Sequence, residues 1–322
     1  MNVGIDVSPL VQTSAGTARH LLGLLGALEG RPGLELTRLT FGGDGRAGTV
    51  ARDAGWYPVG IARAARNLDV LHCPTMRVPI RARPAVVATV HDVAILRYPA
   101  AFPRWHRHTG QLALRQAVRT ADVIVAVSEF TRGELGEVLG VASDRIRVIG
   151  NGVDPVFTAD GRAEGGDYVL AVGTLEPRKN LACAVEAGRL AGLEVRVVGA
   201  TGWGGIDVPG WVGRVDDESL AALYRGARCL IFPSLYEGFG LPILEAMACG
   251  TPVVTSRGGA TEEIAGGAAV LVDPLDAEAI AAGIAVADTR RSELAALGLK
   301  RSAAFTWERA ADALEALWRE LA

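Results

Sequence analysis

The stretch FPSLYEGFGLPILEAMACGTPVVTS, from Phe232 to Ser256, decides the fold of the C-terminal half. It starts with an apolar run that ends at Pro233, as in a short buried strand, and the glycine turn EGFG follows. The residues LPILEAMA, from Leu241 on, then show helical spacing. A strand, a glycine turn and a helix N-terminus together point backbone N–H groups at one place, next to the positive end of the helix. The stretch therefore predicts a site for a phosphate group or for sugar hydroxyls.

Two carboxylates, Glu237 and Glu245, lie eight residues apart in this stretch. Glu237 precedes the helix and Glu245 lies within it, so one can reach the near end of a ligand and the other its far end. Burial of either side chain among apolar neighbours is costly without a partner. The alternative is that Glu237 is a first-turn partner of the helix dipole and that Glu245 faces water.

The chain has 322 residues, of which 49% are hydrophobic, and this is enough for two domains with their own cores. Apolar strands alternate with helices in both halves, a pattern typical of parallel sheets covered on both faces. The turn pair at Asn151 and a glycine-bearing stretch over residues 155–166 indicate a linker. We therefore expect an α/β protein with one doubly wound domain at residues 1–155 and another at residues 156–322.

The net charge of −3 is unevenly distributed, since residues 1–155 carry an excess of cations and all five histidines. Two halves of opposite sign indicate different roles. No apolar run approaches the roughly 20 residues of a membrane span, and the start MNVGIDV lacks the pattern of a signal peptide. We therefore expect a cytoplasmic protein, and we expect no nucleic acid partner.

The four cysteines, Cys73, Cys183, Cys229 and Cys249, form no C-x-x-C pair, and each lies in an apolar segment. Buried thiols are therefore expected in place of a disulfide frame or a metal site. The chain also has no Asp-x-Asp element and no His and carboxylate cluster at metal-ligand spacing. We expect no metal and no other cofactor.

A second candidate site is the segment TLEPRKN, which follows the predicted strand at 168–173 and leads into a helix near Asn180. Arg178 and Lys179 are adjacent cations at this strand-to-helix junction, where a pyrophosphate can bind. Lysine is otherwise scarce in the chain, since Lys300 is the only other one. The alternative is a pair of cations on a loop surface.

Ligands of parallel sheets bind beyond the carboxyl ends of the strands, and His72, His91 and Ser128 lie at or near such ends. His91 follows the predicted strand at 86–90 and precedes Asp92. A neutral imidazole there can bond a sugar hydroxyl or polarise a reacting group near pH 7. The alternative is a histidine bonded to the backbone, and we interpret His72 in this structural way.

The predicted helix over residues 102–120 carries a basic side, made of Arg104, Arg107, His108, Arg115 and Arg119. Such a side contacts anionic lipid headgroups or is simply solvated. Peripheral membrane contact is therefore carried as a hypothesis.

The run EGFGLPILEAMACGTPVV, with Glu237 and Glu245 in an E-x7-E arrangement, resembles the donor-site signature of retaining, nucleotide-sugar-dependent glycosyltransferases of family 4. The resemblance covers most of the C-terminal half and extends more loosely to the N-terminus. It implies the GT-B fold, in which two Rossmann-like doubly wound domains face each other across a cleft. It also implies that the last helix crosses back to the N-terminal domain and that the linker lets the two halves close.

The resemblance implies a role for each candidate residue. Glu245 would hold the ribose hydroxyls of a nucleoside diphosphate sugar, and Arg178 and Lys179 would stabilise the leaving diphosphate. Glu237 would orient the sugar hydroxyls or support the positive charge that develops at the anomeric carbon, and the acceptor would attack near His91 with retention. The remaining donor-binding residues would be Gly16, Gly173, Gly238, Phe239, Gly240 and Leu241.

Gly16 lies in S14-A15-G16-T17-A18-R19, which is similar to the family's loop at the cleft. From the residue alone, this glycine either lets a ligand approach the backbone or is a plain turn glycine. Ala18 stands where a second glycine is common in the family. This departure supports a rival interpretation, a non-catalytic nucleotide-sugar-binding protein of the same fold.

The implied activity is the transfer of a hexosyl group from a nucleotide sugar to a hydroxyl of a glycan, a lipid-linked or a small-molecule acceptor. The stretch HDVAILRYP, from His91 to Pro99, looks most like mannosyl- and rhamnosyltransferases of surface polysaccharides, so GDP-mannose is the first donor to consider. A sugar-nucleotide epimerase or a phosphorylase of the same fold is a rival among enzymes, although no lysine lies beside the central motif for a phosphorylase. An NAD-dependent oxidoreductase is disfavoured, because no strand is followed by G-x-G-x-x-G.

Overall fold

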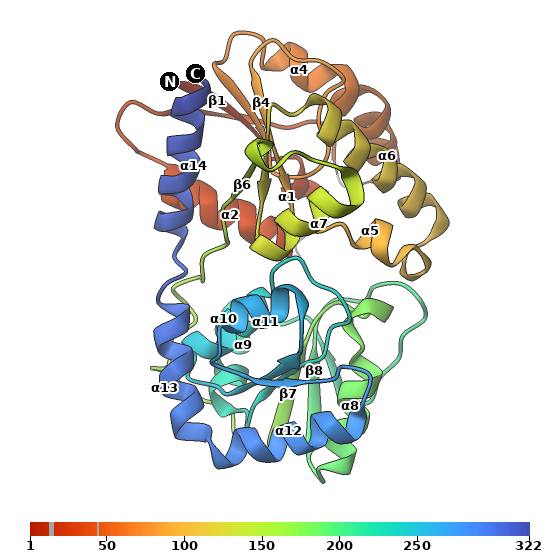
Figure 1. Cartoon of the computed structure of the whole chain (residues 1–322), viewed down its shortest axis with the longest axis vertical. Helices are drawn as coiled ribbons and strands as arrows, with labels where there is room; N and C mark the ends of the chain where they lie inside the picture. Colours follow the sequence, from red (N-terminus) through yellow and green to blue (C-terminus); the bar gives the residue numbers. More distant parts are fainter. Residues whose placement is uncertain (13–15, 44) are drawn as a thin grey trace. The chain divides into compact units, whose positions relative to one another are not determined.

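The computed structural model describes residues 1–12, 16–43 and 45–322. These residues form two compact units (Figure 1). The first unit comprises Met1–Leu96, Arg104–Gly152 and Trp307–Ala322, and the second comprises Arg97–Pro103 and Val153–Thr306. Within the described residues, each unit contains a six-stranded parallel sheet with helices around it, so the predicted α/β class is confirmed.

The first sheet has β1 between β2 and β3. Its strands, in order across the sheet, are β2 (Glu35–Leu39), β1 (Asn2–Asp6), β3 (Val70–Cys73), β4 (Ala85–Val90), β5 (Val123–Ala126) and β6 (Ile146–Val148). Strands β3 and β5 are buried throughout; β5 is a continuous apolar run, and β3 is apolar except for His72. Because the strands are parallel, the residues that follow β1, β2 and β3 lie at the same edge of this sheet.

The helical segments of the first unit connect these strands. They are α1 (Pro9–Gln12), α2 (Gly16–Leu28), α3 (Arg46–Ala51), the π-helix η1 (Arg52–Gly60), α4 (Ile61–Ala64), α5 (Ala94–Arg97, its last residue in the second unit), α6 (Arg104–Thr120), α7 (Glu129–Leu139), η3 (Ser143–Arg145) and α14 (Trp307–Leu321). Ser128 precedes α7, and its Oγ accepts a hydrogen bond from the Thr131 N–H at 3.0 Å. This strand-end serine is therefore a helix cap.

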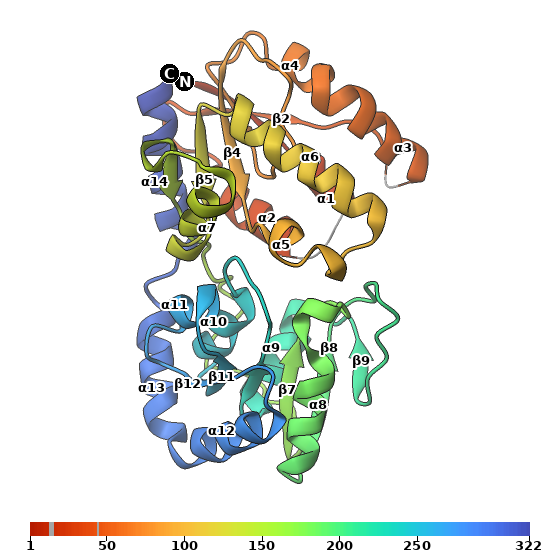
Figure 2. The ribbon, with the colours of Figure 1, turned by 45° about the vertical axis from the view of Figure 1, so that its right-hand side comes forward.

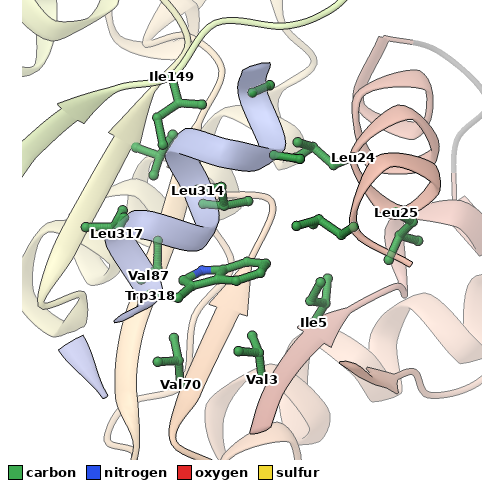
Figure 3. Packing of buried hydrophobic residues seen from close by; sticks show 14 of the residues in the cluster. Val3, Ile5, Leu24, Leu25, Val70, Val87, Ile149, Leu314, Leu317 and Trp318 are labelled. Atoms are coloured by element: carbon green, nitrogen blue, oxygen red, sulfur yellow. The ribbon is translucent and has the colours of Figure 1, made fainter. Parts of the chain in front are cut away.

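The C-terminal helix α14 completes the core of the first unit. The indole of Trp318 is fully buried beside Leu25 of α2 and Val3 of β1 (Figure 3). Its Nε1 donates to Nδ1 of His72 at 3.2 Å, and Nε2 of that histidine lies 3.0 Å from Oγ1 of Thr89. Burial, with a smaller effect of nearby His91, lowers the pKa of His72 to about 3. The predicted return of the last helix to the N-terminal domain is confirmed, and His72 is structural.

The second sheet has β10 and β7 at its centre. Its strands, in order across the sheet, are β12 (Val270–Val272), β11 (Val253–Ser256), β10 (Leu230–Phe232), β7 (Tyr168–Val172), β8 (Glu194–Val198) and β9 (Trp211–Gly213), with β9 at the edge (Figure 2). Because β7 and β10 are parallel neighbours, the loops that follow them leave the sheet side by side.

The helical segments of the second unit are η2 (Pro99–Ala101), η4 (Pro177–Lys179), α8 (Leu181–Leu190), α9 (Asp217–Gly226), α10 (Leu241–Ala248), α11 (Gly259–Ala265), α12 (Ala277–Thr289) and α13 (Arg291–Ser302). The predicted strand, glycine turn and helix appear as β10 and α10. Gly240 precedes α10 with φ of +115°, a backbone conformation that favours glycine.

Three of the four cysteines are buried free thiols, as predicted, and the fourth is a free thiol that is only partly buried. All four are free thiols, and Cys73, Cys229 and Cys249 are buried. Cys183 is only half-buried, so its predicted burial is wrong. It lies on α8 beside the buried Ala184, where the buried face of the helix begins to give way to the exposed one.

No helix in the described part of the chain has both the length and the apolar character needed to span a membrane.

Candidate functional site

The structure joins the two motifs of the C-terminal half through one carboxylate. Glu237 follows β10, and the cations Arg178 and Lys179 lie in the turn η4 after β7. Nη1 of Arg178 lies 2.9 Å from Oε2 of Glu237, and Nζ of Lys179 lies 2.5 Å from Oε1. The side chains of all three residues are largely buried, with exposed fractions of 9 to 14%. Both cations therefore meet the same carboxylate at the carboxyl ends of the two central strands.

The local backbone explains why two adjacent cations point at one group. Pro177 opens the turn η4, and Asn180 closes it in the left-handed region with φ of 55°. Asparagine tolerates this conformation better than most residues. Its Nδ2 donates to the carbonyl of Pro274 at 2.6 Å, which fixes the turn. The turn is thus held rigidly, and both cationic side chains leave it toward β10.

Glu237 is a carboxylate at neutral pH. Burial by itself raises the pKa of this group, but the charges of Lys179 and Arg178 outweigh it, and the pKa is held at about 2. A group with so low a pKa cannot donate a proton as a general acid near pH 7. It can accept hydrogen bonds and stabilise positive charge.

A second carboxylate, which the sequence interpretation did not assign, takes part in the cluster. Glu176 is almost fully buried, and its Oε1 accepts from Nη2 of Arg178 at 2.7 Å. With Glu237 and Lys179 this gives two anions and two cations, so the formal charge of the cluster is zero. Its position two residues before Arg178, in the motif EPRKN, was the only signal for Glu176 in the sequence.

Glu245 lies inside α10 and is 2% exposed, so the alternative that it faces water is wrong. Its Oε2 accepts a hydrogen bond from the hydroxyl of Tyr224, on α9, at 2.9 Å. Tyr224 was not expected at this site, because a tyrosine on a neighbouring helix gives no signal in the sequence pattern. The predicted role of Glu245 toward a ribose stays a prediction.

The other donor-side residues surround these charges. Gly238, Phe239 and Gly240 form the turn before α10, which begins at Leu241. The ring of Phe239 is buried and lies edge-on to Phe305, with ring centroids 6.0 Å apart. This contact packs the turn before α10 against Phe305.

Gly173 follows β7 at the base of the same site. A Cβ added to Gly173 would come within 3.3 Å of Cγ and Cδ of Lys179. Its carbonyl oxygen also lies where a Cβ of Gly199 would be, so the backbones after β7 and β8 are in close contact. Glycine at position 173 therefore lets the Lys179 side chain pass directly over the backbone.

His91 belongs to the first unit and is considered there by itself. Its Nε2 lies 3.0 Å from the carbonyl oxygen of Pro74, so this nitrogen carries a proton and Nδ1 of a neutral ring is an acceptor. Burial lowers the pKa of His91, although the bond to Pro74 and the charge of Asp92 act in the opposite direction. The imidazole is thus neutral at pH 7, as a hydrogen-bonding role near a substrate requires. The alternative interpretation of His91, a histidine bonded to the backbone, also agrees with the structure, since the ring bonds the carbonyl of Pro74.

Gly16 begins α2 and is exposed, and a Cβ added to it would meet no atom within 4 Å. Residues 14 and 15 of the predicted loop lie outside the described residues. The structural role of the loop therefore stays a prediction.

Among the described residues, no group of three or more His, Cys, Asp or Glu side chains is arranged to hold a metal ion. Metal independence itself stays a prediction.

Two protein-family models together match most of the chain. Residues 15–157 match the model described as Glycosyltransferase Family 4, and residues 166–287 match the model described as Glycosyl transferases group 1. The O-antigen chain mannosyltransferase B of Escherichia coli is 34% identical over an alignment of 272 residues, and the match covers 74% of this chain and 71% of that protein.

Solved structures show the same fold at lower identity. Sucrose-phosphate synthase from Thermosynechococcus elongatus superposes with a TM-score of 0.77 and 20% identity, over 100% of this chain and 99% of that chain. Anabaena HepE in complex with UDP-glucose gives a TM-score of 0.73 and 18% identity, over 98% and 99% of the two chains. The GT-B fold expected from the sequence is confirmed.

The ion pairs of Glu237 predict a pH-dependent contribution to stability. Its folded-state pKa of about 2 lies below the ordinary value of 4.5, so its charge stabilises the folded state above pH 4.5. This stabilisation is lost as the pH falls toward 2, and at neutral pH it amounts to roughly 3 kcal/mol. In urea denaturation, the difference in unfolding free energy between wild type and Glu237→Gln should narrow by about 2 kcal/mol from pH 7 to pH 3. Glu218→Gln, an exposed side chain of α9, is the control and should keep the wild-type profile. Parallel pH profiles for wild type and Glu237→Gln would contradict the assignment.

Proposed function

This chain belongs to the group 1 glycosyltransferases of glycosyltransferase family 4, and from this membership we propose that it transfers a mannosyl group from GDP-mannose to a glycan hydroxyl. The observation that carries the proposal is the buried cluster of Glu237, Arg178 and Lys179 beside the glycine turn of α10. Cations next to a helix N-terminus suit a diphosphate, and the carboxylate suits the hydroxyls of a sugar. The cluster thus offers partners for both parts of a nucleotide sugar.

The proposed reaction breaks the bond between the anomeric carbon and the β-phosphate oxygen, and the electron pair leaves with the diphosphate. The oxygen of the acceptor hydroxyl bonds to the anomeric carbon from the same face, with retention, and its proton is released. Arg178 and Lys179 stabilise the charge on the leaving diphosphate, which is a large catalytic effect in a site with little water. The backbone N–H groups of Gly238, Phe239 and Gly240 face the sugar.

The two carboxylates have separate roles in this proposal. Glu237 remains ionised because of its low pKa, so it accepts hydrogen bonds from the sugar and supports positive charge at the anomeric carbon. Glu245, which already accepts from Tyr224, holds the ribose hydroxyls. In the first unit, neutral His91 can bond a sugar hydroxyl through Nδ1, while Nε2 remains on the carbonyl of Pro74.

Two observations favour mannose as the sugar. The Escherichia coli relative is named a mannosyltransferase of the O-antigen chain. The stretch from His91 to Pro99 resembles enzymes that transfer mannose or rhamnose to surface polysaccharides. The acceptor we propose is accordingly a growing polysaccharide, free or linked to a lipid.

Replacement of Lys179 tests the donor site. Lys179→Ala should lower kcat for transfer from GDP-mannose by about 100-fold to 1,000-fold, since one charge that stabilises the leaving group is removed. Lys300→Ala is the matched control, because this lysine lies exposed on α13. The measurement is release of GDP in the presence of a mannoside acceptor. If wild type binds GDP-mannose in a thermal-shift assay but neither transfers nor hydrolyses it, a non-catalytic binder is the better description. If wild type does not bind GDP-mannose, the same thermal-shift assay is repeated with UDP-, ADP- and dTDP-sugars.

We further propose that transfer requires no divalent cation, since Arg178 and Lys179 take the place of a metal beside the diphosphate. Activity should be unchanged after dialysis against EDTA, measured with the same GDP-release assay. Loss of activity with EDTA and its return with Mg²⁺ or Mn²⁺ would contradict this expectation.

We propose that α6 brings a cytoplasmic enzyme to the surface of the membrane. Arg104, Arg115 and Arg119 are exposed on this helix, and Trp105 and Leu112 beside them are 67% and 66% exposed. Cations with exposed apolar side chains are typical of helices that lie on anionic lipid.

The test is sedimentation with vesicles of phosphatidylglycerol and phosphatidylcholine. The combined replacement of Arg104, Arg107, Arg115 and Arg119 by Gln should reduce the bound fraction severalfold, because each cation near an anionic surface contributes about 1 kcal/mol. The matched control replaces Arg290, Arg301, Arg309 and Arg319 by Gln. Equal binding of both variants and wild type would exclude α6 as the contact.

A further inference from the structure

A short segment between the end of α5 and the start of α6 has no role in the mechanism described above. The chain leaves the first unit after Leu96 and returns to it at Arg104, and the residues between them, Arg97–Pro103, belong to the second unit. We call this segment the strap. It contains the 3₁₀-helical turn η2, and the N–H of Ala101 in this turn donates to the carbonyl of Tyr98 at 3.0 Å. The strap is thus part of the unit that holds the donor cluster, although its neighbours in the sequence belong to the other unit.

The strap contacts the loop that follows β8. Nε1 of Trp203, in this loop, donates to the carbonyl of Ala101, and the ring of Trp203 lies 5.7 Å from that of Phe102 between centroids. The same loop lies against the turn that carries the two cations. A Cβ added to Gly204 would come within 2.9 Å of Cγ of Pro177, the residue that opens η4. Trp203 therefore joins the strap to a loop that packs on η4.

The strap also contacts the loop that follows β10. The hydroxyl of Tyr98 donates to the carbonyl of Leu235 at 3.4 Å, and the rings of Tyr98 and Tyr236 lie 5.5 Å apart between centroids. Both residues of this loop are bonded to Arg178. The N–H of Leu235 donates to the carbonyl of Arg178 at 2.9 Å, and the carbonyl of Tyr236 accepts from its Nη1 at 2.7 Å. Since Glu237 is the next residue, Tyr98 packs on the backbone that carries this carboxylate.

The strap thus lies against both loops that contact η4. Loops are the least stable parts of a fold, and a site built on loops needs support from the packing around it. A displacement of about 1 Å in a reacting group can lower a rate by about 100-fold. Tyr98 is 39% exposed and Trp203 is partly buried, so neither side chain belongs to the fully buried core of the unit. Their contacts suit the alignment of the two loops better than the stability of the core.

We propose that Tyr98 and Trp203 are positioning residues of the donor site, which clamp the loops after β8 and β10 and so hold Glu237 in the geometry required for transfer. The role in transfer rests on the proposed function, whereas the clamp itself rests on contacts within the second unit. Neither side chain needs to touch the donor, because Tyr98 acts through the backbone of residues 235–237 and Trp203 acts through the strap. Removal of either contact should therefore loosen these loops without unfolding the unit.

Hydrogen exchange of the full chain, measured by mass spectrometry without any donor, tests the clamp. In Tyr98→Ala the backbone amides of residues 235–240 should exchange roughly tenfold faster than in wild type, since a contact that opposes local opening is lost. Residues 70–90 of the first unit should exchange as in wild type, and circular dichroism verifies the fold. Trp203→Phe keeps an aromatic ring but lacks the N–H that bonds the carbonyl of Ala101. It should accelerate exchange at the same loop severalfold, and it carries the test if Tyr98→Ala does not fold.

Phe41→Ala is the matched control for loss of a half-exposed ring. Phe41 lies in the first unit and is 43% exposed, and its ring is stacked on Trp56 with the same centroid distance of 5.5 Å as in the Tyr98 pair. This variant should leave both the exchange at residues 235–240 and the rate of transfer as in wild type. Unchanged exchange at these residues in Tyr98→Ala and Trp203→Phe would overturn the clamp, and so would equal acceleration in Phe41→Ala.

A double-mutant cycle tests whether Tyr98 acts through Glu237. With GDP-mannose and a mannoside acceptor, Tyr98→Ala should lower kcat about 10-fold to 100-fold, whereas Tyr98→Phe, which keeps the ring on Tyr236, should stay within about threefold of wild type. When Tyr98→Ala is added to Glu237→Gln, the further loss should shrink to less than about threefold, because the group that Tyr98 positions is already altered. A merely structural role predicts losses that multiply in the double variant, and this result would overturn the positioning role.

The two measurements separate failure of the clamp from failure of the proposed function. Transfer from GDP-mannose with unchanged exchange and unchanged kcat in Tyr98→Ala would overturn the clamp and leave the proposed function standing. Faster exchange at residues 235–240 in Tyr98→Ala, without transfer from any nucleotide sugar by wild type, would instead overturn the proposed function and with it the role of the clamp in transfer.

Discussion

The second unit depends on the attraction between one buried carboxylate and two cations. Glu237 is removed from water, and this burial by itself raises its pKa, which the charges of Lys179 and Arg178 bring down again. The same arginine fixes the backbone, because its carbonyl accepts from the N–H of Leu235 at 2.9 Å and its Nη1 donates to the carbonyl of Tyr236 at 2.7 Å. The loop after β7 is thereby fastened to the loop after β10. Removing one partner from such a cluster strongly destabilises the folded state, because a buried charge is left without compensation.

The sequence predicted the strands and the glycine turn of this site, but not which side chains of the two motifs contact each other. The strands β7 and β10 were predicted because their apolar runs have no polar interruption, and the glycine turn before α10 has a local signature. The pairing of Arg178 with Glu237 joins residues 59 positions apart. It follows from the order of strands in the sheet, which places β7 next to β10, and residue spacing contains no information about that order. Tyr224 was missed for the same reason, since it meets Glu245 only in the folded chain. Glu176 was missed although its partner Arg178 lies two positions away, because spacing alone does not show that the two side chains turn toward each other.

The first unit shows how the C-terminal helix supports His91. Trp307 of α14 lies edge-on to His20, with centroids 6.1 Å apart, and His20 in turn lies edge-on to His91 at 4.8 Å. Nδ1 of His20 is 2.6 Å from Oδ1 of Asn151, the residue that the sequence identified only as half of a turn pair. Gly23 on α2 permits this packing, because a Cβ there would come within 2.1 Å of the Trp307 ring. The return of α14, which resemblance to the family predicted, therefore fixes the orientation of a residue far away in the sequence.

The neutral balance of the donor cluster has a consequence for catalysis under the proposed function. The charges of Arg178 and Lys179 are balanced by Glu176 and Glu237. The two cations therefore bind the diphosphate of the ground state less tightly than two unpaired cations would. As the glycosidic bond breaks, negative charge grows on the leaving oxygen and positive charge grows at the anomeric carbon. The cations then interact more strongly with the diphosphate, and Glu237 interacts more strongly with the sugar. Interactions that strengthen only in the transition state raise kcat, whereas equal binding of substrate and transition state does not. A cluster of paired charges, held rigid by η4 and the glycine turn, is therefore better suited to this transfer than two cations alone.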